Sequence, residues 1–280
     1  MSDTTKTPWG AIGFLVLFVC LAQPPRFTAA QEPQGAAPVV PGLFAMGTGG
    51  GVVSDGSVND IRIPIGYTLI PPDDRPWGLR LRLIVYAGIY DLGFSDPDQA
   101  DIKFQSLAAT PGVEFLVPVG KGWTLKPFAE IGYARDFDQN LGLGVWSVGM
   151  RTLAEWEYRN TRTRLGTKVQ WLSTFESDFD LADRFFEFQL GLDVGFRLGF
   201  EIGGSPTYLS PYAIRRQYFD TAIEQPEGDP IEITYSNEIG VAFGAHPRIK
   251  LWFITLPRIG IGYRWGPDVD GWRLSFGFPF

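Results

Sequence analysis

The chain contains a single histidine, His246 in the segment GAHPR, and this residue is the first candidate for a catalytic group. A neutral imidazole can act as the general base for a serine nucleophile, as in enzymes that hydrolyse lipid esters. Such a base has to lie within hydrogen-bonding reach of its nucleophile. The strand pattern described below places His246 in a short turn between two strands. We therefore expect a turn histidine and no enzymatic activity.

Two further motifs have the residue types of ligand sites but lack the spacing. The segment GTGGG at residues 47–51 is rich enough in glycine to cradle a phosphate, yet no Lys, Ser or Thr follows at the spacing of a nucleotide-binding loop. One predicted loop is acidic without the pattern of a calcium-binding loop, and its carboxylates are Asp91, Asp96, Asp98 and Asp101. We expect flexible or closely packed backbone at the first motif and solvated surface at the second.

The composition excludes several other kinds of site. With one cysteine, Cys20, and one histidine, the chain cannot form a disulfide framework, a Cys/His zinc site or a multi-histidine metal centre. Acidic residues outnumber basic residues 31 to 24, so the positive charge that non-specific nucleic-acid binding requires is absent. The sequence therefore predicts no cofactor, no metal and no nucleic-acid partner.

The same composition indicates the fold class. A chain with 45% hydrophobic and 15% aromatic residues is too apolar to be disordered. Its 34 glycines and 22 prolines are spread through aromatic-rich segments, which argues against long helices. One large β domain is the expectation for the 280 residues.

The amino terminus, residues 1–30, is predicted to be a secretory signal peptide. Its uncharged run at residues 11–22 would span only about 18 Å as a helix, against about 30 Å of hydrocarbon in a bilayer. Small residues at Thr28 and Ala30 favour cleavage after Ala30, with Ala22 as a second possible position. Acylation of Cys20 is disfavoured, because the bulky Val19 precedes it.

Residues 31–58 are rich in Gly and Pro and are predicted to form a leader with a weak first strand. Beyond residue 58, apolar and polar residues alternate with a period of two, which is typical of strands with two different faces. Apolar residues keep one parity from 249 to 265 despite Pro257, so we expect one long strand with a local irregularity there. The expected strands cover residues 43–53, 61–69, 77–89, 102–119, 123–133, 146–158, 165–171, 186–198, 208–218, 231–243, 249–265 and 272–280.

Twelve strands are an even number, as a closed antiparallel bacterial barrel requires, and the connections give a second test. Such barrels have short periplasmic turns and longer outer loops. Short connections fall at every second position, at 71–76, 120–122, 159–160, 203–206 and 244–248. This alternation matches an outer-membrane barrel only if the weak strand at 43–53 is counted. The predicted fold is therefore an all-β, transmembrane, up-and-down antiparallel barrel of about 12 strands over residues 59–280, with the leader supplying the first.

One hairpin can be predicted residue by residue. If Arg159 and Asn160 form a two-residue turn, residues whose numbers sum to 319 face each other. The charged face then pairs Glu157 with Arg162 and Glu155 with Arg164. The same register places Arg151 opposite Lys168, a like-charge pair that needs an acid from another strand; the candidates are Glu187, Asp193, Glu232 and Glu238.

Alternation alone does not decide which face is outside, because a soluble β-sandwich or lipocalin has the same period with its apolar residues inside. The export signal, the long strands and the Trp and Tyr residues near strand ends favour apolar side chains toward lipid. The charged face would then line the lumen with Arg62, Arg80, Arg82, Lys126, Glu130, Glu155, Glu157, Arg162, Arg164, Lys168, Glu187, Asp193, Arg197, Glu232, Glu238, Arg264 and Arg273.

The carboxyl-terminal segment WRLSFGFPF resembles the terminal strand signal of bacterial outer-membrane proteins, which alternates apolar residues and ends in Phe. The resemblance implies that the barrel-assembly machinery reads Trp272, Leu274, Phe276, Phe278 and Phe280. More broadly, WGLRLRL, PGVEFLVPVGKGWTLKPFAEIGYARDF, LPRIGIGYRWG and WRLSFGFPF resemble the solitary outer-membrane autotransporter-like barrel domain. That family implies a twelve-stranded barrel similar to an autotransporter translocator, although only residues 31–58 precede the barrel here, too few for a sizeable passenger.

We expect a monomeric protein of the outer membrane of a Gram-negative bacterium, with the membrane lipid and the assembly machinery as partners. A structural or surface role is the first expectation. A narrow, charge-lined, porin-like pore for small solutes and a soluble exported barrel that binds a ligand are the alternatives. Since twelve strands lie between filled eight-stranded and water-filled sixteen-stranded barrels, the lumen is open or plugged, and the leader is a candidate plug.

Overall fold

The computed structural model describes residues 59–73, 75–89, 104–137, 141–175, 184–219, 222–223, 231–232, 234–246, 250–251, 254–255, 258–267 and 269–277. The predicted signal peptide, the leader with its strand at 43–53, and Phe278 and Phe280 lie outside these residues. The described residues contain no helix of the length and hydropathy that a membrane span requires.

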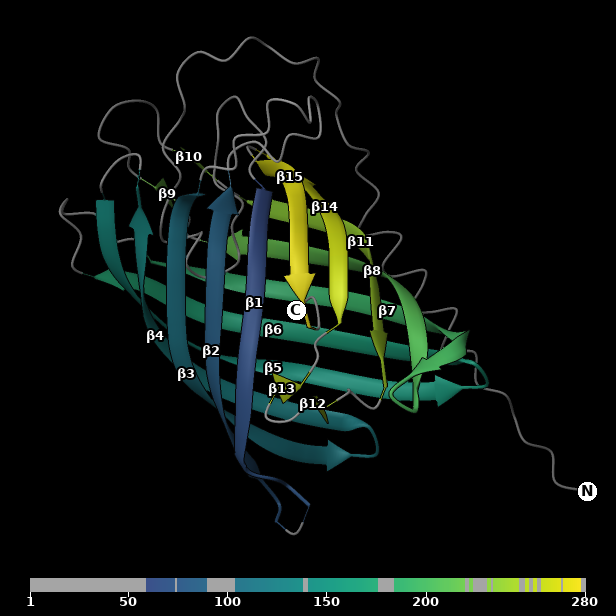
Figure 1. Cartoon of the computed structure of the whole chain (residues 1–280). Helices are drawn as coiled ribbons and strands as arrows, with labels where there is room; N and C mark the ends of the chain where they lie inside the picture. The colour runs from purple at the N-terminus through teal and green to yellow at the C-terminus, as the bar shows by residue number, and fades with distance from the viewer. Residues whose placement is uncertain are drawn as a thin grey trace, which may run out of the picture.

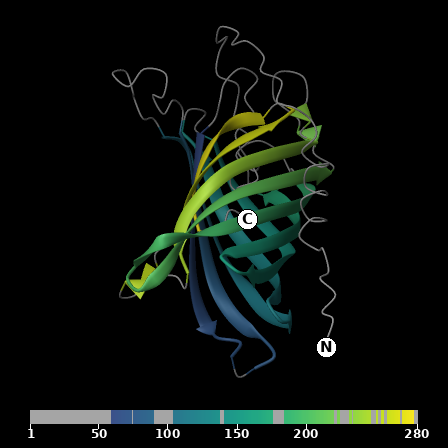
Figure 2. The same cartoon turned by 90° about the vertical axis from the view of Figure 1, so that its right-hand side faces the viewer.

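Eleven strands form one closed barrel (Figures 1 and 2), in the order β1-β15-β14-β11-β8-β7-β6-β5-β4-β3-β2 and back to β1. They are β1 (Asn59–Ile70), β2 (Gly78–Ile89), β3 (Phe104–Gly120), β4 (Trp123–Asp136), β5 (Leu141–Tyr158), β6 (Thr161–Phe175), β7 (Arg184–Ile202), β8 (Ser205–Phe219), β11 (Tyr235–Ala245), β14 (Ile259–Gly266) and β15 (Val269–Phe276). Two small sheets lie outside the ring: β9 (Ala222–Ile223) pairs with β10 (Ile231–Glu232), and β12 (Lys250–Leu251) pairs with β13 (Ile254–Thr255).

The all-β closed barrel is confirmed, but the ring holds eleven strands where about twelve were predicted. The difference arises because β1 hydrogen-bonds directly to β15, which closes the ring. An odd number of up-and-down strands leaves the first and last strands pointing the same way, and this pair is parallel whereas the other pairs of the ring are antiparallel. Figure 1 shows both strands running downward side by side.

This closing pair, here called the seam, is short. Its register joins three residue pairs, Asp60 with Arg273, Ile61 with Leu274 and Arg62 with Ser275. By comparison, β1 follows β2 from Asn59 to Ile70. Among the described residues, the part of β1 beyond Arg62 therefore has a paired strand on one side only.

Two predicted strands are divided in the structure. The segment 249–265 is not one strand, since β12 and β13 pair with each other and β14 begins only at Ile259. The reason is that the neighbouring strand β11 ends at Ala245 and pairs with β14 only as far as Phe243 opposite Ile259. The segment 231–243 is likewise divided, into β10 and β11.

The hairpin of β5 and β6 has the predicted register throughout. Glu157 lies opposite Arg162, and Arg151 lies opposite Lys168. Its tight turn places Arg159 in the left-handed region with a φ of 54°, a conformation that costs a non-glycine residue about 1 kcal/mol or more. Charge pairing and the twist of the flanking strands select the turn in spite of this cost.

The turns between β1 and β2, β3 and β4, β5 and β6, and β7 and β8 lie at one end of the barrel, which we call the turn end. It is the lower end in Figure 1, and β15 runs toward it. The opposite end, the loop end, is where β1 begins, because β1 and β15 are parallel. The predicted even strand count placed the start of the barrel at the turn end instead.

The two faces of each strand differ sharply in chemistry. Outward-facing positions carry exposed apolar side chains in nearly every strand, for example Ile65 in β1, Ile131 in β4 and Val148 in β5. Inward-facing positions carry buried polar and charged residues, and β6 alternates half-buried with buried residues along almost its whole length. The barrel is therefore apolar outside and charged inside, the reverse of a soluble lipocalin.

The parallel seam can be tested by cross-linking. In a variant with Cys20 replaced by Ser, the double substitution Ile61→Cys and Leu274→Cys should form an intramolecular disulfide under mild oxidation, because facing residues of paired strands lie within the range that a disulfide spans. The measurement is the mobility of the unreduced protein on a gel. The pair Ile65→Cys and Leu274→Cys, displaced along β1, is the control, and equal cross-linking of both pairs contradicts the seam.

Candidate functional site

The candidate site is the lumen, where charged side chains from all parts of the ring meet. Three groups can be distinguished by their acids. The central cluster surrounds Glu238, the second cluster surrounds Glu114 and Glu130, and the turn-end recess surrounds Asp193. Most members of each group lie on the inward faces of strands that are neighbours in the ring, where alternate residues share a face.

In the central cluster, one carboxylate serves three arginines. Oε2 of Glu238 lies 2.9 Å from Nη2 of Arg216, 3.2 Å from Nη1 of Arg273 and 3.6 Å from Nη2 of Arg264. Tyr212 donates its hydroxyl to the other oxygen at 3.1 Å. Glu238, Arg216 and Arg273 are at most 1% exposed, so this cluster is fully removed from solvent.

Ion pairs also connect the central cluster to β1 across the seam and, on its other side, to β7 and β6. Arg273 of β15 donates from Nε to Oδ2 of Asp60 in β1 at 2.7 Å. On the other side, Nε of Arg216 lies 3.9 Å from Glu187, whose other oxygen pairs with Nζ of Lys168 at 2.8 Å. The ion pairs therefore connect strands from β1 through β15 to β6 without a break.

The second cluster shares two carboxylates among arginines of β2 and β5. Arg151 contacts Glu114 through Nη1 and Glu130 through Nη2, both at 3.1 Å. Arg82 contacts the same two acids at 3.2 and 3.0 Å, and the guanidinium of Arg151 stacks 3.8 Å over the ring of Phe128. Arg82 makes both contacts through Nη1, whereas Arg151 uses two nitrogens of its planar guanidinium, which fixes the relative position of the two carboxylates.

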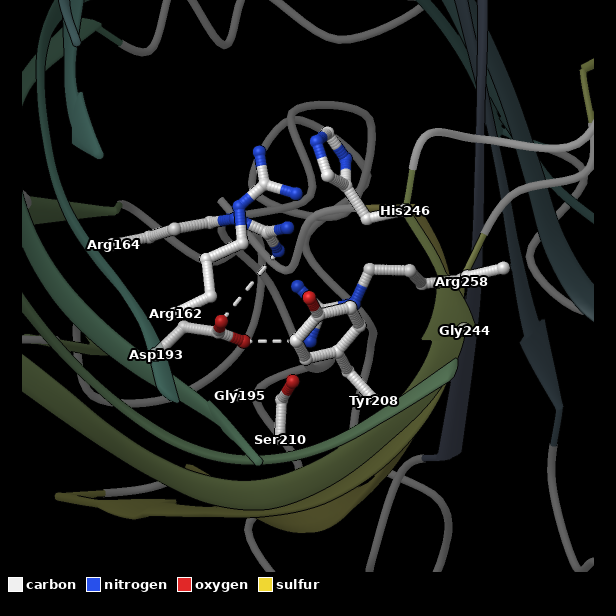
Figure 3. A pocket seen from close by; sticks show the side chains of 10 residues that line it. Arg162, Arg164, Asp193, Gly195, Tyr208, Ser210, Gly244, His246 and Arg258 are labelled. Atoms are coloured by element: carbon white, nitrogen blue, oxygen red, sulfur yellow. Dashed lines mark hydrogen bonds and ion pairs between the residues drawn. The ribbon is translucent and has the colours of Figure 1, made fainter. Parts of the chain in front are cut away.

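The turn-end recess is drawn in Figure 3. Nη2 of Arg258 lies 2.6 Å from Oδ2 of Asp193, and Nη1 of Arg164 lies 3.5 Å from Oδ1. The remaining lining comes from the hairpin of β5 and β6, the hairpin of β7 and β8, and the end of β11; it consists of Arg162, Gly195, Tyr208, Ser210, Gly244, Ala245 and His246. The recess has an empty volume of about 220 Å³, part of which is open to solvent.

His246 follows the last residue of β11 at the turn end, as predicted. Its backbone N–H donates to the carbonyl of Pro206 at 2.9 Å. Partial burial, and then the positive charges of Arg162 and Arg164, hold the pKa of His246 below its ordinary value, so the imidazole is neutral at pH 7. In the described part of the chain, its side chain makes no hydrogen bond to Ser210 or Asp193, although all three residues line the recess.

Most of the residues predicted to line the lumen face inward and are buried or nearly so: Arg62, Arg82, Glu130, Arg162, Arg164, Lys168, Glu187, Asp193, Glu238, Arg264 and Arg273. Arg80, Lys126 and Glu155 are partly exposed. Glu157 and Arg197 reach beyond the lumen at the turn end, with side chains 59% and 48% exposed. Glu232 belongs to β10, outside the ring.

Among the described residues, five buried charged residues were not predicted: Asp60, Glu114, Arg151, Arg216 and Arg258. Arg216 shares its parity with Tyr212 and Tyr218, and its strand was predicted, so the alternation could have found it. Arg151 was placed in the register but was not assigned to the lumen. Arg258 could not be found in this way, because it precedes β14 and reaches across the recess from a connection between strands.

The acids proposed to neutralise the like-charge pair of Arg151 and Lys168 are correct for Lys168 only. Lys168 pairs with Glu187 of β7, one of the proposed acids. Arg151 instead pairs with Glu114 and Glu130, which lie on β3 and β4 on its other side. Of the predicted assembly signal, Trp272, Leu274 and Phe276 belong to β15 at the seam, and their reading by the assembly machinery stays a prediction.

No protein-family model matches the chain, and no curated protein matches it either. Solved structures with some similarity include LpxR from Salmonella typhimurium, with TM-score 0.37 and 11% identity over 78% of this chain and 88% of that one. The β-domain of the Bordetella autotransporter BrkA has TM-score 0.30 and 13% identity over 75% and 93% of the two chains.

The siderophore receptor PirA from Pseudomonas aeruginosa has TM-score 0.33 and 10% identity over 75% of this chain. The match covers 35% of the length of that receptor. Similarities of this size assign neither an activity nor a ligand, and the resemblance to the autotransporter-like family stays a prediction.

The central cluster predicts a large effect of removing its shared carboxylate. Glu238→Gln should lower the free energy of unfolding by about 3–5 kcal/mol, because it leaves buried arginines without their counter-charge. The measurement is the denaturant concentration at which half of the protein has lost the gel mobility of the folded, heat-modifiable form. Glu201→Gln is the control, since the exposed pair of Glu201 with Arg197 should contribute less than about 1 kcal/mol. Equal effects of the two substitutions would refute the cluster.

Proposed function

We propose that this protein is an integral β-barrel of the outer membrane of a Gram-negative bacterium. The observation that carries the proposal is the distribution of side chains, with exposed apolar residues on the outer wall and buried ion pairs inside. A closed barrel satisfies its backbone hydrogen bonds within the wall, which is what a hydrocarbon environment demands. A water-soluble barrel would gain nothing from so large an exposed apolar surface.

Aromatic residues at both ends support the same placement. Trp123 and Tyr158 lie exposed beside turns at the turn end. Tyr133 and Trp272 lie exposed toward the loop end. Trp and Tyr are enriched where a barrel wall meets the lipid headgroups, because one part of each ring is apolar and the other is polar.

Within this placement we assign a structural or surface role without enzymatic activity, in a monomeric barrel of autotransporter-translocator type. The support is the filled lumen, because Glu187, Arg216 and Glu238 have almost no exposure and their ion pairs occupy the interior. Side chains lining an open water channel would be accessible. An eleven-stranded ring lies near the eight-stranded barrels that side chains can fill.

A narrow pore is the second candidate, and the composition of the lumen favours it. Basic residues outnumber acidic ones among the buried charged side chains. A lining of this kind would select anions if water entered it. The barrel-assembly machinery is the partner we propose for the terminal strand, on the pattern of Trp272, Leu274 and Phe276.

The membrane placement predicts losses of stability that differ in size for two matched substitutions. Val148→Lys, in the middle of β5, should lower the free energy of unfolding in lipid vesicles by about 2–4 kcal/mol, because it places a charge at the bilayer centre. Val119→Lys, beside a turn, should cost about 1 kcal/mol or less. Both valines are exposed, at 44% and 48%, so a water-soluble barrel would tolerate both changes equally, and that result would exclude the membrane.

The filled lumen predicts no stable conductance. We expect the refolded protein in a planar bilayer to give no current steps, with insertion shown by heat-modifiable gel mobility of the same sample. The form lacking residues 31–58 should also be silent, because the ion pairs of the wall fill the lumen by themselves. Steps in both forms would favour the pore, and steps only in the shorter form would show that the leader acts as a plug.

A further inference from the structure

The turn-end recess combines guanidinium, hydroxyl and imidazole groups around one small space. We propose that the recess binds a phosphate group, with Arg162 as its principal contact. The site opens at the turn end of the barrel, so it does not depend on whether the lumen conducts.

The donors of the recess come from opposite sides. Figure 3 shows Arg162 and Arg164, from β6, and Arg258, from the other wall, directed toward the same space. Tyr208 and Ser210 of β8 line its floor in this view, and His246 lies above them. Convergent forks from several directions suit a tetrahedral anion better than a planar carboxylate, because each phosphate oxygen can meet a different donor.

The existing acids do not use all of these donors. The two oxygens of Asp193 are engaged by Arg164 and Arg258. Arg162 contacts Glu155 through Nη2 at 2.9 Å, and its Nε lies 3.7 Å from the exposed carboxylate of Glu157. Nη1 of Arg162 is buried and has no hydrogen-bond partner in the described part of the chain. A buried donor without an acceptor has lost its hydration without compensation, and an anion in the recess would supply the missing acceptor.

The space itself depends on two glycines. A Cβ atom at Gly195 would lie 3.0 Å from Oγ of Ser210 and 3.4 Å from the ring of Tyr208, so a larger residue there would press on the floor. A Cβ atom at Gly244 would collide with the side chain of Arg258. A larger residue at either position would therefore displace side chains that line the recess.

The acids at the recess are divided between its inner and outer sides. The described residues that line it include three arginines and one acid, Asp193. Glu155 contacts Arg162 at 2.9 Å and Arg164 at 3.0 Å, and Glu157 lies 3.7 Å from Arg162. The side chains of Glu155 and Glu157 are 31% and 59% exposed, so water screens these pairs more than the buried pairs of Asp193. The neutral imidazole of His246 adds no repulsion and can donate one N–H.

The test is titration calorimetry of the purified full-length protein in detergent at low ionic strength, with inorganic phosphate as the probe. We expect saturable binding of one phosphate for each chain. Arg162→Gln should weaken it at least tenfold, and Arg162→Lys should restore part of the loss. Gly195→Ala should weaken binding without a change of charge, which separates the recess from a general effect of positive charge.

The matched control is Arg197→Gln, which removes an exposed arginine at the same end of the barrel. Its phosphate affinity should stay within twofold of that of the unchanged protein. Heat-modifiable gel mobility confirms that each variant is folded, and Gly195→Ala provides the test if Arg162→Gln does not fold. The proposal is overturned by an absence of saturable binding, by equal affinity for acetate, or by equal losses in the Arg162 and Arg197 variants. None of these results would affect the Val148 and Val119 comparison, which tests the membrane placement separately.

Discussion

The structure depends on the neutralisation of charge inside a wall whose outer face is apolar. A buried ion loses its hydration, and only close opposite charges with good hydrogen-bond geometry compensate for the loss. The barrel meets this requirement by sharing carboxylates, as Glu238 does among Arg216, Arg264 and Arg273. These arginines lie on the neighbouring strands β8, β14 and β15, and Arg273 also binds Asp60 of β1, so the full set of ion pairs is present only when the ring is closed. The ion pairs thus specify the arrangement of strands as well as filling the lumen.

Much of the wall could be predicted from the sequence, because both period and register are local properties. The hairpin of β5 and β6 shows this most clearly, since a two-residue turn at Arg159 and Asn160 fixes the partner of each residue from Tyr158 back to Gly144. The inward face of β6, with Arg162, Arg164 and Lys168, then followed from parity alone. The charged side was identified without any knowledge of the ring, because alternate residues of a strand share a face.

The remaining errors concern relations that are not local. The acids that neutralise Arg151 lie on β3 and β4. The alternation along a strand shows that a side chain faces the lumen, but it does not show whether its partner is on an earlier or a later strand. Arg258 escaped prediction because it acts from a connection, where no period applies. The strand count failed for a similar reason, since the pairing of β1 with β15 joins the two ends of the described ring and leaves no signal in either segment.

The seam also bears on the order in which the barrel forms. Arg273 and Asp60 are 213 positions apart in the sequence, whereas the other ring pairs form between strands much closer along the chain. Contacts between distant segments carry the largest loss of chain entropy and form slowly. With three residue pairs to offset that loss, the seam gains stability only after the adjoining hairpins are in place. Ring closure is therefore the final step of folding, and the central cluster, which spans the seam, reaches electrical balance at that step.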